Sequence, residues 1–384
     1  MTMDGNRTIN VLSDCIVSPL GFTSDANFSA VLEGRTCLKR YEGVFGVPDP
    51  FVASLFDRES LEEECRREGV RGDFTFFEKC MILSARKALE GCGVDPSSDR
   101  VLFVVSTTKG NVDILTSSGE VDAREYLHGS AGVLASYFHN PNTPIVVSNA
   151  CISGVCALIE AMRAIRSGRY DYAVVTGADC QSRFIVSGFQ SFKALSDEPC
   201  RPFDATRKGL NLGEASATVV LGAEGGTGWE ISDGVIRNDA NHISGPSRTG
   251  EGSFRVLRYL MENIGKDELA FLNVHGTSTP YNDEMESIAI DRAGLSDVPV
   301  NALKGYYGHT MGAAGVLETI ISMKAADAGI VLATKGYSEC GVSCPVNVSD
   351  RIRTTDRKSF IKLLSGFGGC NAGVLLKKGG HDEY

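Results

Sequence analysis

The sequence lacks the features that mark several protein classes. Its 384 residues contain no apolar run of the 18 or more residues that a membrane-spanning helix needs, and no CxxC pair among 12 cysteines. Basic residues are in the minority, because 38 Lys and Arg stand against 48 Asp and Glu, for a formal net charge of −10. We therefore expect no membrane insertion, no disulfide framework and no nucleic acid partner, since nucleic acid binding requires a basic surface.

Motifs for metals and nucleotides are also missing. There is no HExxH, no cluster of His and Cys at ligand spacing, no P-loop and no GxGxxG after a strand. These absences predict a protein without a metal ion or a bound cofactor. Residues Met1 to Thr8 do not follow the charged-then-apolar layout of a signal peptide, so we expect a cytoplasmic location with reduced cysteines.

The chain does contain an alternation of short apolar, β-branched runs with longer stretches of helical period, which is typical of an α/β fold. Predicted strands are Val101–Ser106, Pro144–Asn149, Tyr172–Thr176, Ala217–Leu221, Ala270–Val274 and Val298–Asn301, with a last one at Val374–Lys377. Predicted helices are Phe74–Glu90 with Asp73 as N-cap, Ile152–Arg166, Ser253–Asn263 and Thr310–Ala326. The length suggests two to three domain-sized units, and similar strand-to-helix junctions near residues 150 and 310 indicate two similar halves.

Three residues at such junctions could perform chemistry. Cys151 directly follows a predicted strand and opens a helix, a position that favours a thiolate because of the helix dipole. His275 ends a predicted strand, at the edge where open α/β sheets bind ligands, and His309 stands in a glycine-rich turn before a helix. A cysteine and two histidines in these positions suggest a nucleophile with an attendant base.

A glycine-rich segment, SGFGGCNAG at 365–373, precedes the last predicted strand. Because glycine has no Cβ, such a loop can bring backbone N–H groups close to a reacting oxygen, or it can move. A plain tight turn needs fewer glycines.

These segments and others resemble, in order, five motifs of the β-ketoacyl-acyl carrier protein synthases, the condensing enzymes of the thiolase-fold superfamily. The matches are Ala150-Cys151 with the helix from Glu160-Ala161 to Asp171; RPFDxxRxGxxxGE at Arg201 to Glu214; HGTxTxxND at His275 to Asp283; KxxxGHxxxAAG at Lys304 to Gly315; and GFGGxN at Gly366 to Asn371. The resemblance runs almost from end to end and implies a thiolase-like fold of two α/β halves, an αβαβα sandwich. We place the halves at residues 1–222, with the cysteine, and 223–384, with the histidines.

The resemblance also implies a role for each matching residue. Cys151 is expected to carry the acyl group, His275 and His309 to stabilise the enolate that forms when a malonyl group loses CO₂, and the backbone N–H groups of Cys151 and Phe367 to form the oxyanion hole. Further roles are implied for Lys304, Glu318 and Asp283, which support the histidines; for Thr277 and Thr279, which contact the pantetheine arm; and for Gly366, Gly368 and Gly369, the gate loop around Phe367.

The implied partners are an acyl carrier protein, which brings its substrates on phosphopantetheine, and a second subunit. That subunit is either another copy of this chain or a partner of the chain-length-factor kind. Arg66, Arg67 and Arg71 are candidates for contacting the acidic carrier, although a solvated helix face explains them as well.

Two alternatives remain open: a non-catalytic subunit of the chain-length-factor kind, opposed by the presence of Cys151 and both histidines, and a non-decarboxylating thiolase with Cys370 as its second cysteine.

Some positions depart from the common form of the motifs. Ser278 replaces a glycine of HGTGT, and Ser106–Gly110 carries Lys109 in a region that is commonly glycine-rich at the distal end of the acyl pocket. Lys109 therefore favours a specialised polyketide or polyene route over ordinary saturated fatty-acid synthesis.

Overall fold

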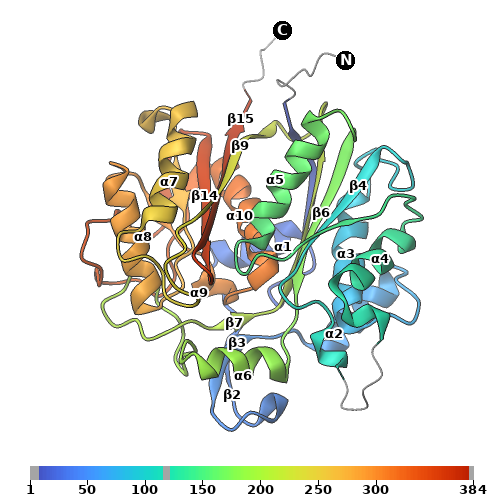
Figure 1. Cartoon of the computed structure of the whole chain (residues 1–384), viewed down its shortest axis with the longest axis horizontal. Coiled ribbons are helices and arrows are strands. Elements are labelled where there is room, and N and C mark those ends of the chain that lie inside the picture. The colour runs from blue at the N-terminus through green and yellow to red at the C-terminus, as the bar shows by residue number, and fades with distance from the viewer. Residues whose placement is uncertain (1–7, 116–121, 380–384) are drawn as a thin grey trace.

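The computed structural model describes residues 8–115 and 122–379 and is built on one ten-stranded mixed sheet (Figure 1). Five strands come from the first part of the chain, in the order β5-β4-β6-β8-β1, and five from the rest, in the order β11-β10-β14-β15-β9. Their bounds are β1 Asn10–Val17, β4 Val101–Ser106, β5 Ile145–Val147, β6 Tyr172–Asp179, β8 Ala215–Gly222, β9 Trp229–Asn238, β10 Phe271–Asn273, β11 Val300–Asn301, β14 Ser359–Gly366 and β15 Cys370–Lys378.

The two groups of strands have the same pairing pattern. In the first, β4 runs parallel to β5 and β6, and β8 runs antiparallel to β6 and β1. In the second, β10 runs parallel to β11 and β14, and β15 runs antiparallel to β14 and β9. The groups meet only where Asn10 of β1 pairs with Glu230 of β9. The two similar halves are therefore present, and the boundary between residues 222 and 223 stays a prediction.

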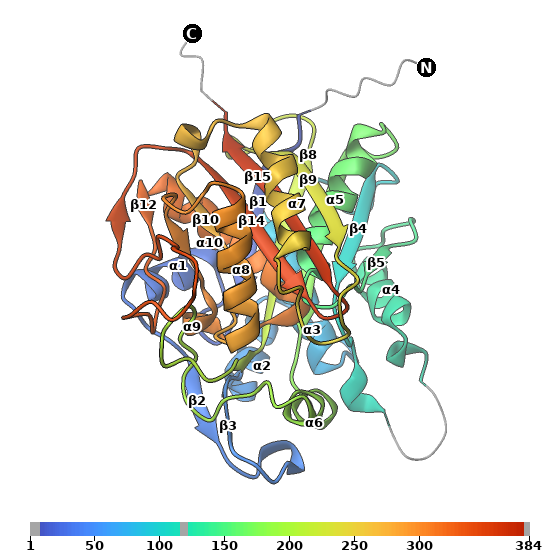
Figure 2. The same cartoon turned by 60° about the vertical axis from the view of Figure 1, so that its left-hand side comes forward.

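Helices form three layers around the two sheet halves. α5 (Ser153–Arg166) and α10 (Ala314–Asp327) contact each other and lie between the halves, with strands of both groups against them. α3 (Phe76–Leu89) covers the outer face of the first group, and α7 (Glu251–Leu260) with α8 (Pro280–Arg292) lies on the outer side of the second, as Figure 2 shows. This is the predicted αβαβα sandwich.

Smaller elements complete the described chain. They are the helices α1 Ser24–Leu32, α2 Arg58–Arg67, α4 Leu127–Tyr137, α6 Arg183–Ser191 and α9 Lys304–Tyr307, a small sheet of β2 Leu38–Tyr41, β3 Phe51–Ser54 and β7 Leu212–Gly213, and the pair β12 Ile330–Val331 and β13 Arg353–Thr354. Each predicted strand and helix overlaps one in the structure, with β4 at its predicted bounds.

The predicted helix starts need two corrections. Asp73 is not the N-cap of α3, because Thr75 takes that position and forms a capping box with Glu78, which satisfies two backbone N–H groups at once. The helix predicted from Thr310 starts later than expected. Its first residues form a short 3₁₀ turn at Met311–Ala313, and α10 begins directly after that turn.

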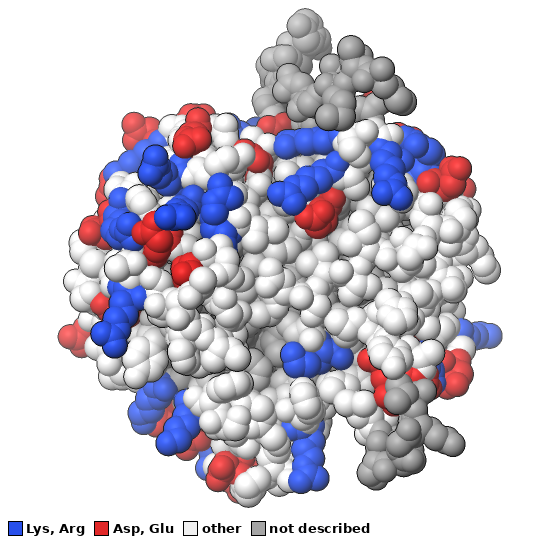
Figure 3. Space-filling view, viewed as in Figure 1, with Lys and Arg blue, Asp and Glu red and all other residues white. Residues whose placement is uncertain are grey.

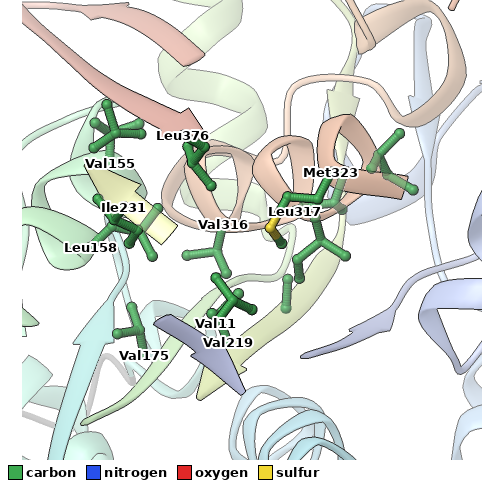
Figure 4. Close-up of a cluster of buried hydrophobic side chains, with 14 of the residues drawn as sticks. Val11, Val155, Leu158, Val175, Val219, Ile231, Val316, Leu317, Met323 and Leu376 are labelled. Atoms are coloured by element: carbon green, nitrogen blue, oxygen red, sulfur yellow. The ribbon is translucent and has the colours of Figure 1, made fainter. Parts of the chain in front are cut away.

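The core is continuous between the halves. Apolar side chains of α5 and α10 pack with those of β1, β6, β8, β9 and β15, as Figure 4 shows for Val155, Leu158, Val316 and Leu317. The two helices approach closely because glycines stand where they cross: a Cβ on Gly315 would lie 2.3 Å from the backbone N of Val155. Both glycines at the crossing, Gly154 and Gly315, belong to segments that the motifs singled out.

No helix in residues 8–115 and 122–379 is long and apolar enough to cross a membrane.

Candidate active site

Cys151 lies in a tight turn between β5 and α5. The preceding residue, Ala150, has a φ of 45°, in the left-handed region that side chains other than glycine rarely adopt. Ser153 holds this turn, because its Oγ accepts the Asn149 N–H at 2.8 Å and donates to the Ala150 carbonyl at 2.6 Å. The strained turn presents Cys151 just before Ile152, the N-cap of α5.

The structure brings both predicted histidines to this cysteine. The candidate reactive atoms of Cys151, His275 and His309 all lie within 4.8 Å of one another, and the two imidazole rings meet edge to face at 5.1 Å between centroids. All three residues are buried, at 7%, 3% and 1% exposure.

The polar atoms of the imidazoles are only partly satisfied. His309 Nδ1 accepts the backbone N–H of Met311 at 3.2 Å, so a neutral His309 carries its proton on Nε2. That Nε2 atom and His275 Nδ1 are buried without a hydrogen-bond partner among the residues that the structure describes. An unpartnered N–H directed into the site is a donor ready for a substrate oxygen.

Burial controls the protonation of all three groups. It lowers the pKa of both histidines well below 6.5, and the nearby charge of Lys304 lowers them further. Burial also raises the pKa of Cys151 to about 12, with opposing contributions from Lys304 and the Phe367 N–H. The thiolate expected from the helix start is therefore wrong for the resting protein, which holds a thiol beside two neutral imidazoles.

Buried charges surround the histidines. The Glu318 carboxylate on α10 accepts from Lys304 Nζ at 2.9 Å and from Lys362 Nζ at 2.5 Å. Burial alone would raise the pKa of Glu318, but the two lysines outweigh it and lower that pKa. Lys304 and Glu318 thus lie as expected, whereas Lys362 was missed, although a lysine within the apolar run FIKLL of β14 could have signalled it.

Two acidic residues of α8 fix the turn after β10. Glu286 accepts the backbone N–H groups of His275 and Gly276, each at 2.7 Å, and Asp283 accepts those of Thr277 and Phe203 at 3.0 and 2.8 Å. The expected support of the histidines by Asp283 is therefore indirect, because Asp283 holds the backbone of the turn that follows His275. Glu286 was not predicted, although its spacing of three residues from Asp283 places both on one helix face.

Cys151 and Phe367 line two cavities. The larger, about 1150 Å³, extends along α6 and the segment Thr108–Leu115. The smaller, about 390 Å³, contains His275 and His309 together with Thr277 and Thr279. The two threonine hydroxyls lie 2.9 Å apart, and Thr279 caps α8.

The side chain of Phe367 stands between the cavities and packs against Phe189 and Phe192, with ring centroids 5.9 and 5.5 Å away. The glycines beside it are held in place: Gly368 N–H donates to the Ile243 carbonyl at 2.7 Å, and the Gly369 carbonyl accepts from Asp239 N–H at 2.8 Å. Phe367 therefore lines both cavities from a loop that is anchored by the segment after β9.

Gly366 is required for space. A Cβ on this residue would lie 3.1 Å from the Cys151 backbone N and 2.8 Å from Cys370 Sγ. The backbone N–H of Phe367 is directed at the Cys151 sulfur, which it favours in the charged form. The two predicted oxyanion donors thus meet at Cys151, and Cys370, 4% exposed, packs beside them.

The unusual segment at Lys109 belongs to the larger cavity. Asp179 at the end of β6 is buried and accepts the Thr107 hydroxyl and the Thr108 N–H, and it also accepts the Gly312 N–H at 2.6 Å. This carboxylate fixes the segment against the turn before α10. Lys109 lines the larger cavity, as do the basic residues Arg58 and Arg183.

Three basic residues predicted to contact a carrier, Arg66, Arg67 and Arg71, are exposed, and Arg67 pairs with Glu64 and Glu68. They do not line the smaller cavity. The exposed residues Lys193, Lys208 and His242 do.

Family models for the β-ketoacyl synthase match this chain over most of its length, the N-terminal domain at residues 7–224 and the C-terminal domain at residues 229–338. The chain belongs to the β-ketoacyl synthase family. It is therefore an acyltransferase of the condensing class, with the fold and reaction class that the motifs predicted.

Individual β-ketoacyl synthases agree with this assignment. A putative mitochondrial 3-oxoacyl-[acyl-carrier-protein] synthase of Schizosaccharomyces pombe is 27% identical over 94% of this chain and 97% of its own length. The tetracenomycin polyketide synthase ketoacyl synthase alpha subunit of Streptomyces glaucescens is 29% identical over 77% of this chain and 80% of its own. The solved ketosynthase ApeO of Xenorhabdus doucetiae, in complex with its chain length factor ApeC, superposes with a TM-score of 0.85 at 22% identity, covering 97% of this chain and 98% of that one.

Proposed function

We propose that this β-ketoacyl synthase condenses an acyl group held on Cys151 with a malonyl group held on an acyl carrier protein, releasing CO₂ and a β-ketoacyl-carrier. The observation that carries the proposal is the convergence of Cys151, His275 and His309 within 4.8 Å where two cavities meet. One cavity suits the acyl chain, since its lining is mostly apolar, and the other suits the arm of the carrier.

In the first step the Cys151 sulfur attacks the thioester carbonyl. A C–S bond forms, the negative oxygen accepts from the N–H groups of Cys151 and Phe367, and the pantetheine sulfur leaves with the proton that Cys151 carried. With a pKa of about 12, the thiol keeps this proton until a substrate is bound. The proton therefore moves during acylation and is not lost to solvent beforehand.

In the second step the malonyl group loses CO₂. The electron pair of the broken C–C bond moves onto the thioester oxygen as an enolate, which His275 and His309 stabilise by donating hydrogen bonds. The enolate carbon then attacks the acyl carbonyl on Cys151, and the Cys151 sulfur leaves and takes up a proton. The bond from Met311 N–H to His309 Nδ1 keeps the His309 proton on Nε2, facing the substrate.

Separate variants test the two steps. Cys151→Ala should show no acyl adduct by intact-mass spectrometry, whereas Cys156→Ala, in the helix α5 that follows Cys151 but outside both cavities, should be acylated like the wild type. His309→Ala should form the adduct and release CO₂ from malonyl-carrier at least about 100-fold more slowly. An adduct on Cys151→Ala, or unchanged CO₂ release from His309→Ala, contradicts the assigned roles.

The two alternatives make different predictions. A non-catalytic subunit would form no adduct on Cys151, and a thiolase would join two acetyl thioesters without releasing CO₂. Cys370 has little freedom for the thiolase role, because its Sγ donates to the Phe367 carbonyl at 3.3 Å and lies in packed surroundings.

We propose that the acyl substrate is a specialised polyketide or polyene chain and not a saturated fatty acyl chain. Lys109, Arg58 and Arg183 support the polyketide form of this choice, because charged groups along the larger cavity suit a chain that carries polar oxygens. A panel of acyl-carriers that differ in length and unsaturation, scored by acylation and extension, decides it. Preference for saturated chains would refute the choice.

The proposed partners are the carrier and a second subunit. β5 is an edge strand next to the Cys151 turn, and Ile145 on it is 37% exposed, which supports a homodimer, or a heterodimer with a chain-length-factor-like chain, formed along this edge. Figure 3 shows a central area almost free of charge on one face, with acidic and basic groups intermingled above it. Sedimentation of the purified chain as a monomer would exclude the homodimer.

We further propose a cytoplasmic location, and catalysis without a metal or bound cofactor because phosphopantetheine arrives on the carrier. Free cysteines throughout the described chain support a reducing compartment. Full activity after treatment with a chelator is expected.

A further inference from the structure

Lys362 is a buried lysine whose position in the protein interior is not explained by ion pairing alone. It lies in the middle of β14, between Asn273 of β10 and Val374 of β15, and its side chain is 0% exposed. Its Nζ atom donates to Glu318 at 2.5 Å and to the Val274 carbonyl at 3.3 Å. Val274 directly precedes His275, so this ammonium joins the strand end that carries one imidazole to α10.

Glu318 already has a partner without it. The other carboxylate oxygen of Glu318 accepts from Lys304, the first residue of α9, at 2.9 Å. Burying an additional ammonium costs several kcal/mol in a protein interior, and a single carboxylate is neutralised by one lysine. The extra positive charge therefore calls for another explanation.

The charge of Lys362 is felt at both imidazoles. Burial, then Lys304 and then Lys362 lower the pKa of His309, and Lys362 is also among the causes that lower the pKa of His275. Since each imidazole must keep one N–H facing the substrate, a cation nearby helps by resisting a second proton on the ring. Protonation of His309 at Nδ1 would also break its bond from Met311 N–H.

We propose that Lys362 is a positioning residue for the decarboxylation step, which fixes the His275 end of β10 and keeps both imidazoles neutral through its charge. The inference rests on the proposed function for its catalytic consequence. The proposed role of Lys362 is limited to decarboxylation, the step that uses the histidines. Acylation of Cys151 should not depend on it, because neither Lys362 nor its hydrogen-bond partners line either cavity at Cys151.

Several titratable groups face this ammonium or the imidazoles and belong to the same network. They are Lys304 on α9, Glu318 on α10, Glu286 on α8 and Cys151 before α5. Tyr307 on α9 and Asp283 on α8 lie one step further out, beside Glu318 and Glu286 respectively. Burial raises the pKa of Asp283 to about 6 and of Glu286 to about 7, so α8 loses negative charge as the pH falls toward 6. Burial likewise lowers the pKa of Lys362 to about 8.

The test removes the charge and keeps the bulk. Lys362→Met is compared with Lys377→Met on the neighbouring strand β15, where the Nζ of a half-buried lysine donates to the Asn263 carbonyl at 2.8 Å. Histidine side chains labelled with ¹⁵N are titrated by NMR, and CO₂ release from malonyl-pantetheine is followed from pH 5 to 9. We expect the imidazole midpoints to rise in Lys362→Met and the acid limb of CO₂ release to move up with them, by at least about half a pH unit.

Acylation of Cys151 in Lys362→Met should stay within about twofold of the wild type, and Lys377→Met should match the wild type throughout. Imidazole titrations that do not move in a folded Lys362→Met protein overturn the proposal. Because NMR detects the histidines without turnover, an enzyme that releases no CO₂ would refute the proposed function while the titrations still decide the role of Lys362.

The wild-type protein gives a further test that requires no variant to fold. When Lys362 loses its proton near pH 8, both imidazoles lose a nearby cation, so their ¹⁵N shifts should show a second, smaller transition between about pH 7 and 9. Lys362→Arg should remove that transition and keep the imidazole midpoints low, because arginine stays charged. Imidazole midpoints that rise in Lys362→Arg as much as in Lys362→Met overturn the proposal, because the charge of Lys362 would then not be the cause.

Discussion

Three residues with a positive φ stand beside the chemistry. Ala150 precedes Cys151, Ser278 follows Thr277, and Met311 donates its N–H to His309, with φ values of 45°, 67° and 48°. Left-handed backbone costs such residues about 1 to 2 kcal/mol, and the surrounding hydrogen bonds maintain it. Ser278 shows how: its Oγ accepts the Arg201 N–H at 2.7 Å, which glycine at this position could not do.

Gly366 provides a residue-scale prediction. In Gly366→Ala the new Cβ would press on the Cys151 backbone N, one of the two oxyanion donors, from 3.1 Å. We expect acylation to slow by about 10²-fold, the usual effect of losing one such donor. Single-turnover acylation measures it, with Gly132→Ala on α4, where a Cβ meets nothing within 4 Å, as control. Unchanged acylation would show that this N–H does not serve the oxyanion.

At the scale of elements, the sequence identified those with simple patterns. The nearly all-apolar run of β4 was placed at its bounds, and Cys151 and His275 follow strands as predicted, because each junction is encoded locally. His309 corrects the prediction of a strand-to-helix turn, since it lies between the short helix α9 and the 3₁₀ turn at Met311–Ala313. β14 was not predicted, since a lysine in its centre resembles an exposed position until Glu318 is brought against it. Such partners are far apart in the sequence, so only the fold reveals them.

The crossing of α5 and α10 provides an element-scale prediction. A Cβ at Gly315 would lie 2.3 Å from the Val155 N, which is backbone and cannot rotate away. Gly315→Ala should therefore force the helices apart and lower the free energy of unfolding by about 1 to 3 kcal/mol. Chemical denaturation measures this. Gly132→Ala, in an uncrowded helix, is expected to be neutral or slightly stabilising, and equal effects of the two substitutions would refute the crowding argument.

For the whole molecule, the central layer makes the two halves interdependent. α5 comes from the first half and α10 from the second, yet both pack against strands of both groups. Each half also has a buried cluster on its outer face, but unfolding either half would expose the shared central core to water. Their boundary therefore separates two similar structures without separating two independent units of stability.

This interdependence predicts a single cooperative unfolding transition in calorimetry. Leu317→Ala, within the central core, should lower that one transition as a whole, by about 2 to 5 kcal/mol. Ile243→Ala, at a side chain 72% exposed, should change it by less than about 0.5 kcal/mol. Two separate transitions, or a Leu317→Ala effect on only part of the signal, would contradict a shared core.

The Phe367 ring between the two cavities has a consequence for how such an enzyme can diversify. In the proposed function, chain preference depends on the larger cavity with the segment at Lys109, whereas the carrier arm meets Thr277 and Thr279 in the smaller one. Among the residues that the structure describes, Cys151, Phe367 and the nearby Phe189 and Phe192 belong to both linings. Substitutions can thus accumulate on one side without disturbing the other, so the choice of product and the choice of delivery partner are free to evolve separately.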